Sequence, residues 1–226
     1  MTFLVTAGPT IEDIDPVRFV SNRATGKLGV EMARCALRQG YRVILIHGLL
    51  PDEVRRTIPS ARGLTSVPVR SAADMHKAVM RHAGTAHVVI MNAAVADYTP
   101  ARRAGAKLKK SKRELVLRLK ATVDILAALG ELKRRRRKDL VLIGFALETG
   151  IGRTELQRAK SRLAEARRKL RAKNLDAIVL DTPSAMGAEK SAFTVLLRDG
   201  RTRHFASTSK ARLARIVVEL GAGWCG

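Results

Sequence analysis

The stretch FLVTAGPT (3–10) and the segment DPVRFVSNRATGKLG (15–29) that follows it decide the fold of this chain. The apolar run at 3–6 has no polar alternation, which is typical of a strand buried on both faces of a sheet. A glycine-containing loop comes next, and a helical pattern starts at Lys27. Backbone amides at the start of a helix favour anions, and Gly26 allows an anion to approach closely. This order of strand, loop and helix predicts an anion-binding loop at the edge of an α/β sheet.

The same alternation of strand and helix patterns continues along the chain. Further buried strands are predicted at 43–46, 88–91, 140–143 and 177–180, and helices at 27–38, 71–82, 153–172 and 210–220. Such alternation predicts an α/β fold with a mostly parallel, doubly wound, Rossmann-like sheet, whose ligands bind beyond the carboxyl ends of the strands. A strand at 193–197 before the turn residues Asp199 and Gly200 predicts an additional hairpin.

Residues 98–120 break this alternation. The segment is polar and basic at first. Leu115, Leu117 and Leu119 then alternate with other residues, which predicts an exposed strand in a projecting flap. We expect this flap to make contacts between two copies of the chain. Neither a linker nor an internal repeat interrupts the remaining sequence, so we expect residues 1–226 to form a single domain.

The chain is strongly basic, with 43 Lys and Arg against 20 Asp and Glu and a formal net charge of +23. This charge favours anionic partners such as nucleotides, phosphorylated metabolites or nucleic acid, although charge runs such as 133–138 usually face solvent. The apolar runs are all shorter than the roughly 18 residues that a membrane span needs. The two cysteines, Cys35 and Cys225, cannot define a disulfide framework, so we expect a reducing, cytoplasmic location without a membrane partner.

Polar side chains that could carry chemistry follow the predicted strands. Asp97 stands after the strand at 88–91, where it could bind a ribose, a base or a metal ion. Lys107 in the flap could neutralise phosphate charge. Lys169 and Lys173 lie four residues apart and share one helix face. Each also has an ordinary structural explanation, such as a turn, a solvated loop or a helix C-terminus, and no His or Cys spacing predicts a zinc site.

Several longer blocks occur in one order across nearly the whole chain. They are VTAGPTIEDIDPVRFVSN (5–22), TGKLG (25–29), NAAVADYTP (92–100), KLKK (107–110), IGFALET (143–149) and ARRKLRAKNLDAIV (166–179). With these blocks the chain resembles the bacterial phosphopantothenoylcysteine synthetases, or phosphopantothenate–cysteine ligases, usually the C-terminal half of a bifunctional coenzyme A biosynthesis protein. The flavin decarboxylase half of such proteins has no counterpart in this sequence, so a separate decarboxylase is a possible partner.

The resemblance implies a two-step ligase reaction. The carboxylate of 4′-phosphopantothenate attacks the α-phosphate of a nucleoside triphosphate and pyrophosphate leaves. The amine of L-cysteine then displaces the nucleoside monophosphate from the acyl-nucleotide, which is acyl-CMP when CTP is used. The resemblance also implies CTP rather than ATP as co-substrate, Mg²⁺ as cofactor, and a homodimer in which the flap contributes to the partner's active site.

Site residues are carried over by position. The resemblance implies catalytic roles for Asn22 and Lys107, and substrate contacts from Arg18, Gly8 and Gly26. Nucleotide contacts are implied for Asn92, Ala93, Asp97, Lys107, Val123, Asp124, Ile125, Leu126, Phe145, Lys169 and Lys173. No metal ligand is assigned. The family usually carries Asn-Pro-Asp-Ile where this chain has Thr122-Val123-Asp124-Ile125, which leaves the choice between CTP and ATP open.

Two other classes of protein fit parts of the pattern. A nicotinamide-dependent oxidoreductase would share the sheet, but the Gly-x-Gly-x-x-Gly loop is missing, and neither Tyr41 nor Tyr98 is followed by a lysine four residues on. A nucleic-acid-binding protein would fit the charge, but aromatic residues make up only 4% of the chain, too few for a stacking platform. The ligase is therefore the favoured function, and nucleic acid is a disfavoured partner.

Overall fold

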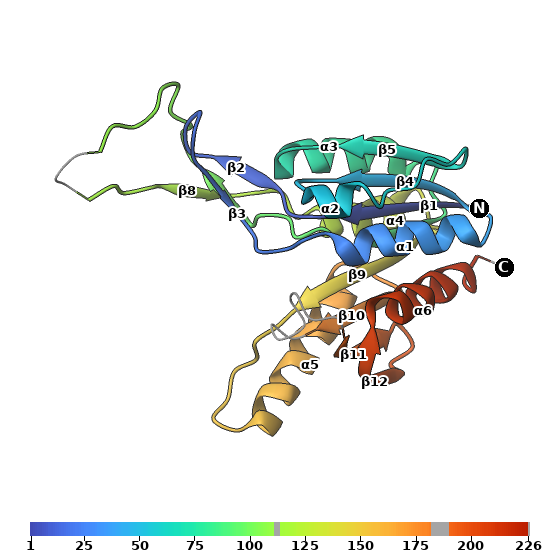
Figure 1. Ribbon diagram of the computed structural model, residues 1–226. Coiled ribbons are helices and arrows are strands. Elements are labelled where there is room, and N and C mark those ends of the chain that lie inside the picture. The colour runs from blue at the N-terminus through green and yellow to red at the C-terminus, as the bar shows by residue number, and fades with distance from the viewer. Residues whose placement is uncertain (111–113, 182–189, 226) are drawn as a thin grey trace.

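The computed structural model describes residues 1–110, 114–181 and 190–225. Its centre is an eight-stranded sheet made of β1 (Thr2–Ala7), β4 (Arg42–His47), β5 (Leu64–Pro68), β6 (Val88–Met91), β9 (Val141–Leu147), β10 (Ala177–Asp181), β11 (Lys190–Leu197) and β12 (Thr202–Ser209). The order is β12-β11-β10-β9-β6-β1-β4-β5 (Figure 1). Pairing is parallel from β5 to β10, and β11 and β12 add an antiparallel edge. The predicted fold class, a mostly parallel α/β sheet, is confirmed.

Helices cover both faces of this sheet and bury two apolar layers. They are α1 (Lys27–Arg38), α2 (Asp52–Arg55), α3 (Ala72–Ala83), α4 (Ile125–Arg135), α5 (Glu155–Ala172) and α6 (Lys210–Ala222). Successive side chains of a strand point to opposite faces, so neighbouring residues of β1 enter different layers. Phe3 joins the layer that contains Val30 of α1 and Val217 of α6. Leu4 joins the layer that contains Met75 of α3 and Leu129 of α4.

The strand order reverses between β1 and β6, because β4 and β5 extend the sheet on one side and β9 and β10 on the other. In a doubly wound sheet such a reversal leaves a crevice at the carboxyl ends of the strands, where ligands bind. The loops after β1 and β6 start at Gly8 and Asn92, respectively. The fold therefore brings two of the quoted sequence blocks to one edge of the sheet.

Two predicted signals at the ends of helices and strands, a capping box and a turn, are confirmed. Ser71 Oγ accepts a hydrogen bond from the Asp74 amide at 3.1 Å, and the Asp74 carboxylate accepts one from the Ser71 amide at 3.0 Å, which completes the predicted capping box of α3. The predicted turn at Asp199 and Gly200 joins β11 to β12. The edge strand β5 was not predicted from the sequence, because its residues are polar or half exposed and form no continuous apolar run. Helix α4 was not predicted either.

The basic run 133–138 is only partly solvated, contrary to the usual fate of charge runs. Lys133 is buried, with 6% of its surface exposed, and forms an ion pair with Asp176. Burial lowers the pKa of Lys133, although its hydrogen bond to Asp176 opposes this effect. Arg137 donates to the backbone carbonyl oxygens of Gly84 and Ala86 beyond the end of α3. These two cations therefore tie α4 and its following turn to the rest of the fold.

Two short hairpins stand outside the central sheet. β2 (Ile11–Asp13) pairs with β3 (Phe19–Ser21), and β7 (Tyr98–Pro100) pairs with β8 (Leu119–Ala121). The second hairpin is the base of the predicted flap, which projects from the carboxyl edge of the sheet (Figure 1). The prediction of a strand over 115–119 is mostly wrong, since only Leu119 belongs to β8. In the described part of the flap, the backbone pairing of β7 with β8 extends one residue past these strands, where the Ala101 amide donates to the Arg118 carbonyl oxygen at 2.8 Å.

Helix α5 packs on the sheet with only its C-terminal half. The sequence predicts an apolar stripe along the helix, and Ala166 and Leu170 near its end are indeed buried. Leu156 near its start is 67% exposed, because the helix begins away from the sheet (Figure 1). In the part of the chain that the structure describes, no helix combines the length and apolar character that crossing a membrane requires.

Candidate functional site

A cavity of about 750 Å³ opens at the carboxyl edge of the sheet, beyond β6, β9 and β10. Segments that are distant in sequence form its wall. They are the end of β3 and the residues after it (21–24), the loop after β6 (92–95 and 97), the start of α4 and the residues before it (122–126), the end of β9 (145–147) and the C-terminal end of α5. The cavity therefore lies where the strand order places a ligand.

The structure brings most of the sequence-predicted site residues together. Eleven of them line this cavity: Asn22, Asn92, Ala93, Asp97, Val123, Asp124, Ile125, Leu126, Phe145, Lys169 and Lys173. Four others are not among the lining residues: Gly8, Gly26, Arg18 and Lys107. The first two shape the loop behind the cavity, and the last two belong to the hairpin and the flap.

Asn22 is fixed to the loop after β6. Its Nδ2 donates to the carbonyl oxygens of Ala94 at 3.0 Å and Val95 at 3.3 Å. Directly before it, Ser21 Oγ donates to the Thr10 carbonyl at 2.7 Å. The β2–β3 hairpin thus returns the chain to the edge of the sheet and places the Asn22 amide against the loop after β6. These contacts give the Asn22 side chain a defined position in the cavity wall.

Two threonines organise the same loop, and the sequence analysis assigned no role to either. Thr6 Oγ1 in β1 accepts from the amides of Asn92 and Ala93, both at 3.0 Å. Thr10 Oγ1 accepts from the Ala96 amide at 2.9 Å. Both threonines are buried, and their hydroxyls satisfy backbone amides of the loop after β6. For Thr6, the available sequence signal was a hydroxyl near the end of an apolar, fully buried strand.

Gly8 and Gly26 allow the first loop and the start of α1 to approach each other. Their φ angles are +73° and +76°, in the left-handed region that favours glycine. A Cβ on Gly26 would lie 2.9 Å from the Gly8 nitrogen, and a Cβ on Gly8 would lie 2.8 Å from the Leu49 carbonyl oxygen. The two glycines are therefore required by backbone packing beside the cavity.

Lys169 in α5 and Lys173, the residue directly after this helix, each face a carboxylate. Lys173 Nζ lies 2.7 Å from Asp124 Oδ2, and Lys169 forms an ion pair with Glu148. Asp124 also caps α4 by accepting from the Ala127 amide at 3.0 Å. Burial opposes ionisation of Asp124, but the hydrogen bonds from Lys173 and Ala127 outweigh it and lower the pKa of this carboxyl. A bound anion would compete with these carboxylates for both ammonium groups.

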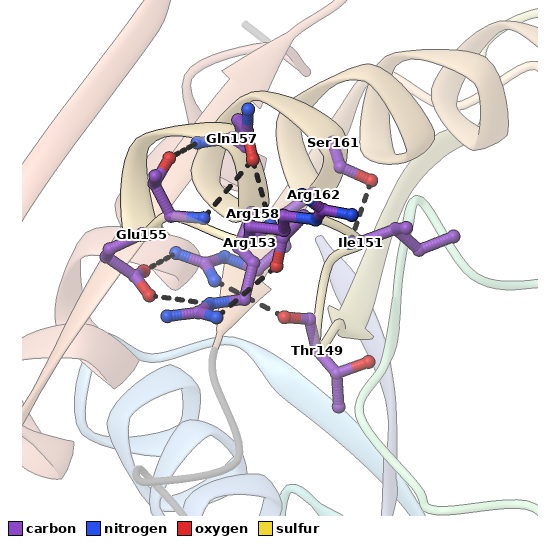
Figure 2. Close-up of polar contacts among 10 residues, drawn as sticks. Thr149, Ile151, Arg153, Glu155, Gln157, Arg158, Ser161 and Arg162 are labelled. Carbon is purple, nitrogen blue, oxygen red and sulfur yellow. Dashed lines mark hydrogen bonds and ion pairs between the residues drawn. The ribbon is translucent and has the colours of Figure 1, made fainter.

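The connection from β9 to α5 sets the direction of that helix. Thr154 and Gln157 form a capping box, and the Gln157 side chain also accepts from the Arg153 amide at 2.8 Å. Ser161 Oγ accepts from the Ile151 amide at 3.2 Å (Figure 2). The connection is thus folded back along the first turns of α5, while the two lysines at the other end of the helix reach the cavity.

Metal binding by protein groups alone is not supported for the described residues. They contain no group of three or more His, Cys, Asp and Glu side chains that could hold an ion. Asp97 and Asp124 nevertheless line the cavity. Mg²⁺ that arrives with phosphates needs only one or two carboxylates, so these residues fit a cation that is bound mainly by its ligand.

Comparisons with known proteins agree with the fold and with the quoted blocks. The chain matches the family model "DNA/pantothenate metabolism flavoprotein C-terminal domain" over residues 1–222. It is 40% identical over 225 residues to the coenzyme A biosynthesis bifunctional protein CoaBC of Bacillus subtilis, covering 97% of this chain and 50% of that protein. The chain therefore spans about half the length of the curated relatives that it matches.

Two solved structures extend the comparison. The C-terminal domain of a CoaBC protein superposes with a TM-score of 0.76 at 34% identity, over 98% of this chain and 94% of that one. The DNA/pantothenate metabolism flavoprotein of Streptococcus pneumoniae superposes with a TM-score of 0.81 at 23% identity, over 99% of both chains, which is a likeness of fold. The resemblance inferred from the sequence blocks is confirmed: the chain belongs to the family of the DNA/pantothenate metabolism flavoprotein C-terminal domain.

Proposed function

We propose that this chain is a phosphopantothenate–cysteine ligase of coenzyme A biosynthesis, which joins 4′-phosphopantothenate and L-cysteine through an acyl-nucleotide and releases pyrophosphate. One observation carries the proposal: Asn22, Asp97, Lys169 and Lys173, from three separate segments, line one cavity at the carboxyl edge of the sheet. The names of the CoaBC relatives point to the same pathway. A cytoplasmic location is part of the proposal.

The first step would join the substrate carboxylate to the α-phosphorus and break the bond to pyrophosphate. The carboxylate itself is the nucleophile, so the enzyme needs no nucleophilic side chain and contributes mainly position and charge stabilisation. Lys169 and Lys173 would exchange their carboxylate partners for phosphate oxygens. Their charges would then stabilise the negative charge that moves onto the leaving pyrophosphate.

In the second step the cysteine amine would attack the acyl carbon, lose a proton and displace the nucleoside monophosphate. Asn22 stands at the junction of the hairpin and the loop after β6, where its amide would bind the acyl-nucleotide. The protein groups in the cavity wall would hold the cysteine amine close to the acyl carbon. The reaction would then proceed between bound, oriented groups and would not depend on a bimolecular encounter in solution. Exclusion of water by these walls would protect the activated acyl group from hydrolysis.

Mg²⁺ and CTP complete the proposal. Asp97 and Asp124 would share a magnesium ion with the triphosphate, and the ion would supply charge neutralisation at the phosphates. Phe145 lines the cavity together with the small side chains of Ala93 and Ala94, which suits a planar base. CTP is the proposed nucleotide, and ATP is the alternative.

A homodimer would account for the position of the flap. Lys107 is exposed and does not line the cavity of its own chain. The flap and the β2–β3 hairpin expose large apolar side chains, namely Val17, Phe19, Val20, Tyr98, Leu115, Val116, Leu117 and Leu119. We propose that two copies bury this surface and that the flap of each copy extends over the cavity of the other. A flavin decarboxylase would be a further partner.

One assay tests the ligase function. The purified chain is mixed with 4′-phosphopantothenate, L-cysteine, Mg²⁺ and either CTP or ATP, and the release of pyrophosphate and formation of the amide are followed. Pyrophosphate should form with at least one of these nucleotides, and a stoichiometric burst should remain when cysteine is omitted. If the folded protein released pyrophosphate with neither CTP nor ATP, the proposal would be refuted. Fluorescence titration with NADPH tests the oxidoreductase alternative, which tight binding would support.

A further inference from the structure

Asp15 lies in the turn between β2 and β3, and its side chain is completely buried, with 0% exposed. Its Oδ1 accepts hydrogen bonds from the amides of Val17 and Arg18, both at 2.8 Å. Its Oδ2 accepts from Arg18 Nε at 3.0 Å and from the Leu108 amide at 3.1 Å. A buried carboxylate is costly unless such bonds satisfy it. All of its donors come from its own turn except one, which comes from the flap.

Leu108 is held at both of its backbone polar groups. Its amide donates to Asp15, and its carbonyl oxygen accepts from Arg18 Nη2 at 2.8 Å. A further bond joins the same two segments, because the Ala104 amide donates to the Ile14 carbonyl at 2.9 Å. Leu108 follows Lys107 directly in the sequence. Fixing both backbone groups of Leu108 therefore fixes the peptide from which the Lys107 side chain emerges.

We propose that Asp15, acting together with Arg18, is a positioning residue that fixes the flap backbone at Leu108 and thereby places Lys107 for its work on the triphosphate. The inference rests on the ligase function proposed above and gives the β2–β3 hairpin a task in it. Arg18 then acts through the flap backbone, in keeping with its place outside the cavity lining. The Arg18 guanidinium, helped by three backbone amides and opposed by burial, holds the pKa of Asp15 well below its ordinary value, so the carboxylate is ionised at neutral pH.

The same hairpin contains a second buried carboxylate with a different task. Glu12, 4% exposed, accepts a hydrogen bond from the Ala72 amide at the start of α3, at 2.8 Å. Glu12 therefore fastens the hairpin to the body of the protein, whereas Asp15 fastens the flap to the hairpin. Glu12→Gln is the matched control for Asp15→Asn, because both changes remove the charge of a buried carboxylate that accepts from a backbone amide.

Amide hydrogen exchange tests the contact without reference to activity. In the wild-type chain the Leu108 amide should exchange at least about tenfold more slowly than the rate for an unstructured chain. Asp15→Asn should remove this protection, and Glu12→Gln should leave it in place. Exchange of the wild-type Leu108 amide at the unstructured rate would overturn the proposal even if Asp15→Asn failed to fold. Unchanged protection in a folded Asp15→Asn variant would also overturn it.

Kinetics test whether the contact acts through Lys107. Misplacing a reacting group costs about tenfold to a hundredfold, so Asp15→Asn should lower kcat by this amount with little change in the KM for 4′-phosphopantothenate. Introduced into Lys107→Ala, the same change should lower kcat no further, whereas residues that act independently would give multiplied losses. Multiplied losses, or an equal loss in Glu12→Gln, would overturn the proposal. If the wild type lacks ligase activity, the proposed function fails, and the exchange result separately decides the contact.

Discussion

The cavity and the flap are built in opposite ways. The cavity wall follows strands that have neighbours on both sides, such as β6 between β1 and β9. Its central loop is held by Thr6 and Thr10, whose hydroxyls are buried. The flap rests on a hairpin of two short strands, and it exposes apolar residues such as Val116, 78% of whose surface is accessible.

This difference shows that two kinds of interaction position the residues of one proposed site. Burial of the sheet fixes the cavity, so its geometry should persist as long as the domain is folded. A small number of hydrogen bonds fix the flap at Leu108, whose amide donates to Asp15 and whose carbonyl oxygen accepts from Arg18. The flap should therefore open locally at a much lower free energy than global unfolding. Four predictions test or sharpen this contrast.

The largest effect is expected beneath the cavity. Ile143 in β9 is completely buried and packs toward α6 near Gly221. Ile143→Ala should lower the free energy of unfolding by about 2–5 kcal/mol, because it removes apolar contacts and leaves a void. Urea unfolding followed by circular dichroism measures this loss. A decrease below about 1 kcal/mol would mean that the sheet under the cavity relaxes readily, and the contrast with the flap would disappear.

A change in the cavity wall should affect turnover more than stability. Asn22→Asp removes the donor to the Ala94 and Val95 carbonyl oxygens and places a negative charge beside them. Loss of one such donor at a reacting centre typically costs about 10²-fold or more in kcat, so amide formation should fall by this factor. Steady-state assays measure the rate, and circular dichroism serves as the control for folding. Unchanged turnover would remove Asn22 from the proposed catalytic residues.

A smaller effect, and one that depends on pH, is expected at the Asp124–Lys173 pair. The pKa of Asp124 is lower when folded than when unfolded, so its contribution to stability is present above the unfolded pKa and is lost as pH falls through the folded pKa. Asp124→Asn keeps an oxygen that can cap α4 but removes the charge. The variant should be less stable than wild type by up to about 1 kcal/mol at pH 7, and this difference should shrink as pH falls below about 3.9, the ordinary pKa of an aspartate.

Urea unfolding of wild type and Asp124→Asn at neutral pH and over a series of lower pH values tests this expectation. A difference that persists at low pH would indicate a loss of capping rather than of the ion pair. Since the carboxylate is half exposed, high salt should reduce the difference at pH 7.

The smallest effect on folding is expected in the flap. Val116→Ser should change the free energy of unfolding of the monomer by no more than about 0.5 kcal/mol, because the side chain is exposed. The same change should weaken self-association if the flap is the proposed dimer contact. Sedimentation velocity over a range of concentrations measures this weakening. A stability loss comparable to that of Ile143→Ala would show that the flap is packed within one chain.

Sequence patterns predicted the buried strands of the central sheet. The apolar runs at 3–6 and 88–91 lie within β1 and β6, since strands buried on both faces need uninterrupted apolar residues. The flap was predicted as a segment, but its strand at 115–119 was not found, because alternating leucines do not specify a pairing partner. The edge strand β5 and helix α4 were missed, since neither has a pattern as strong as that of the buried strands.

For the candidate site, the order and spacing of the motifs were enough to show which blocks belong together, because both can be read without knowledge of contacts. How these blocks are arranged in space depends on the tertiary fold. The structure placed Asn22, Asp97, Lys169 and Lys173 around one cavity, and it left Arg18 and Lys107 outside the lining. It also revealed that the buried Asp15 carboxylate accepts a hydrogen bond from the amide of Leu108, which is far away in the chain. Hydrogen bonds over such separations depend on how strands and hairpins pack, and local sequence patterns carry no record of that packing.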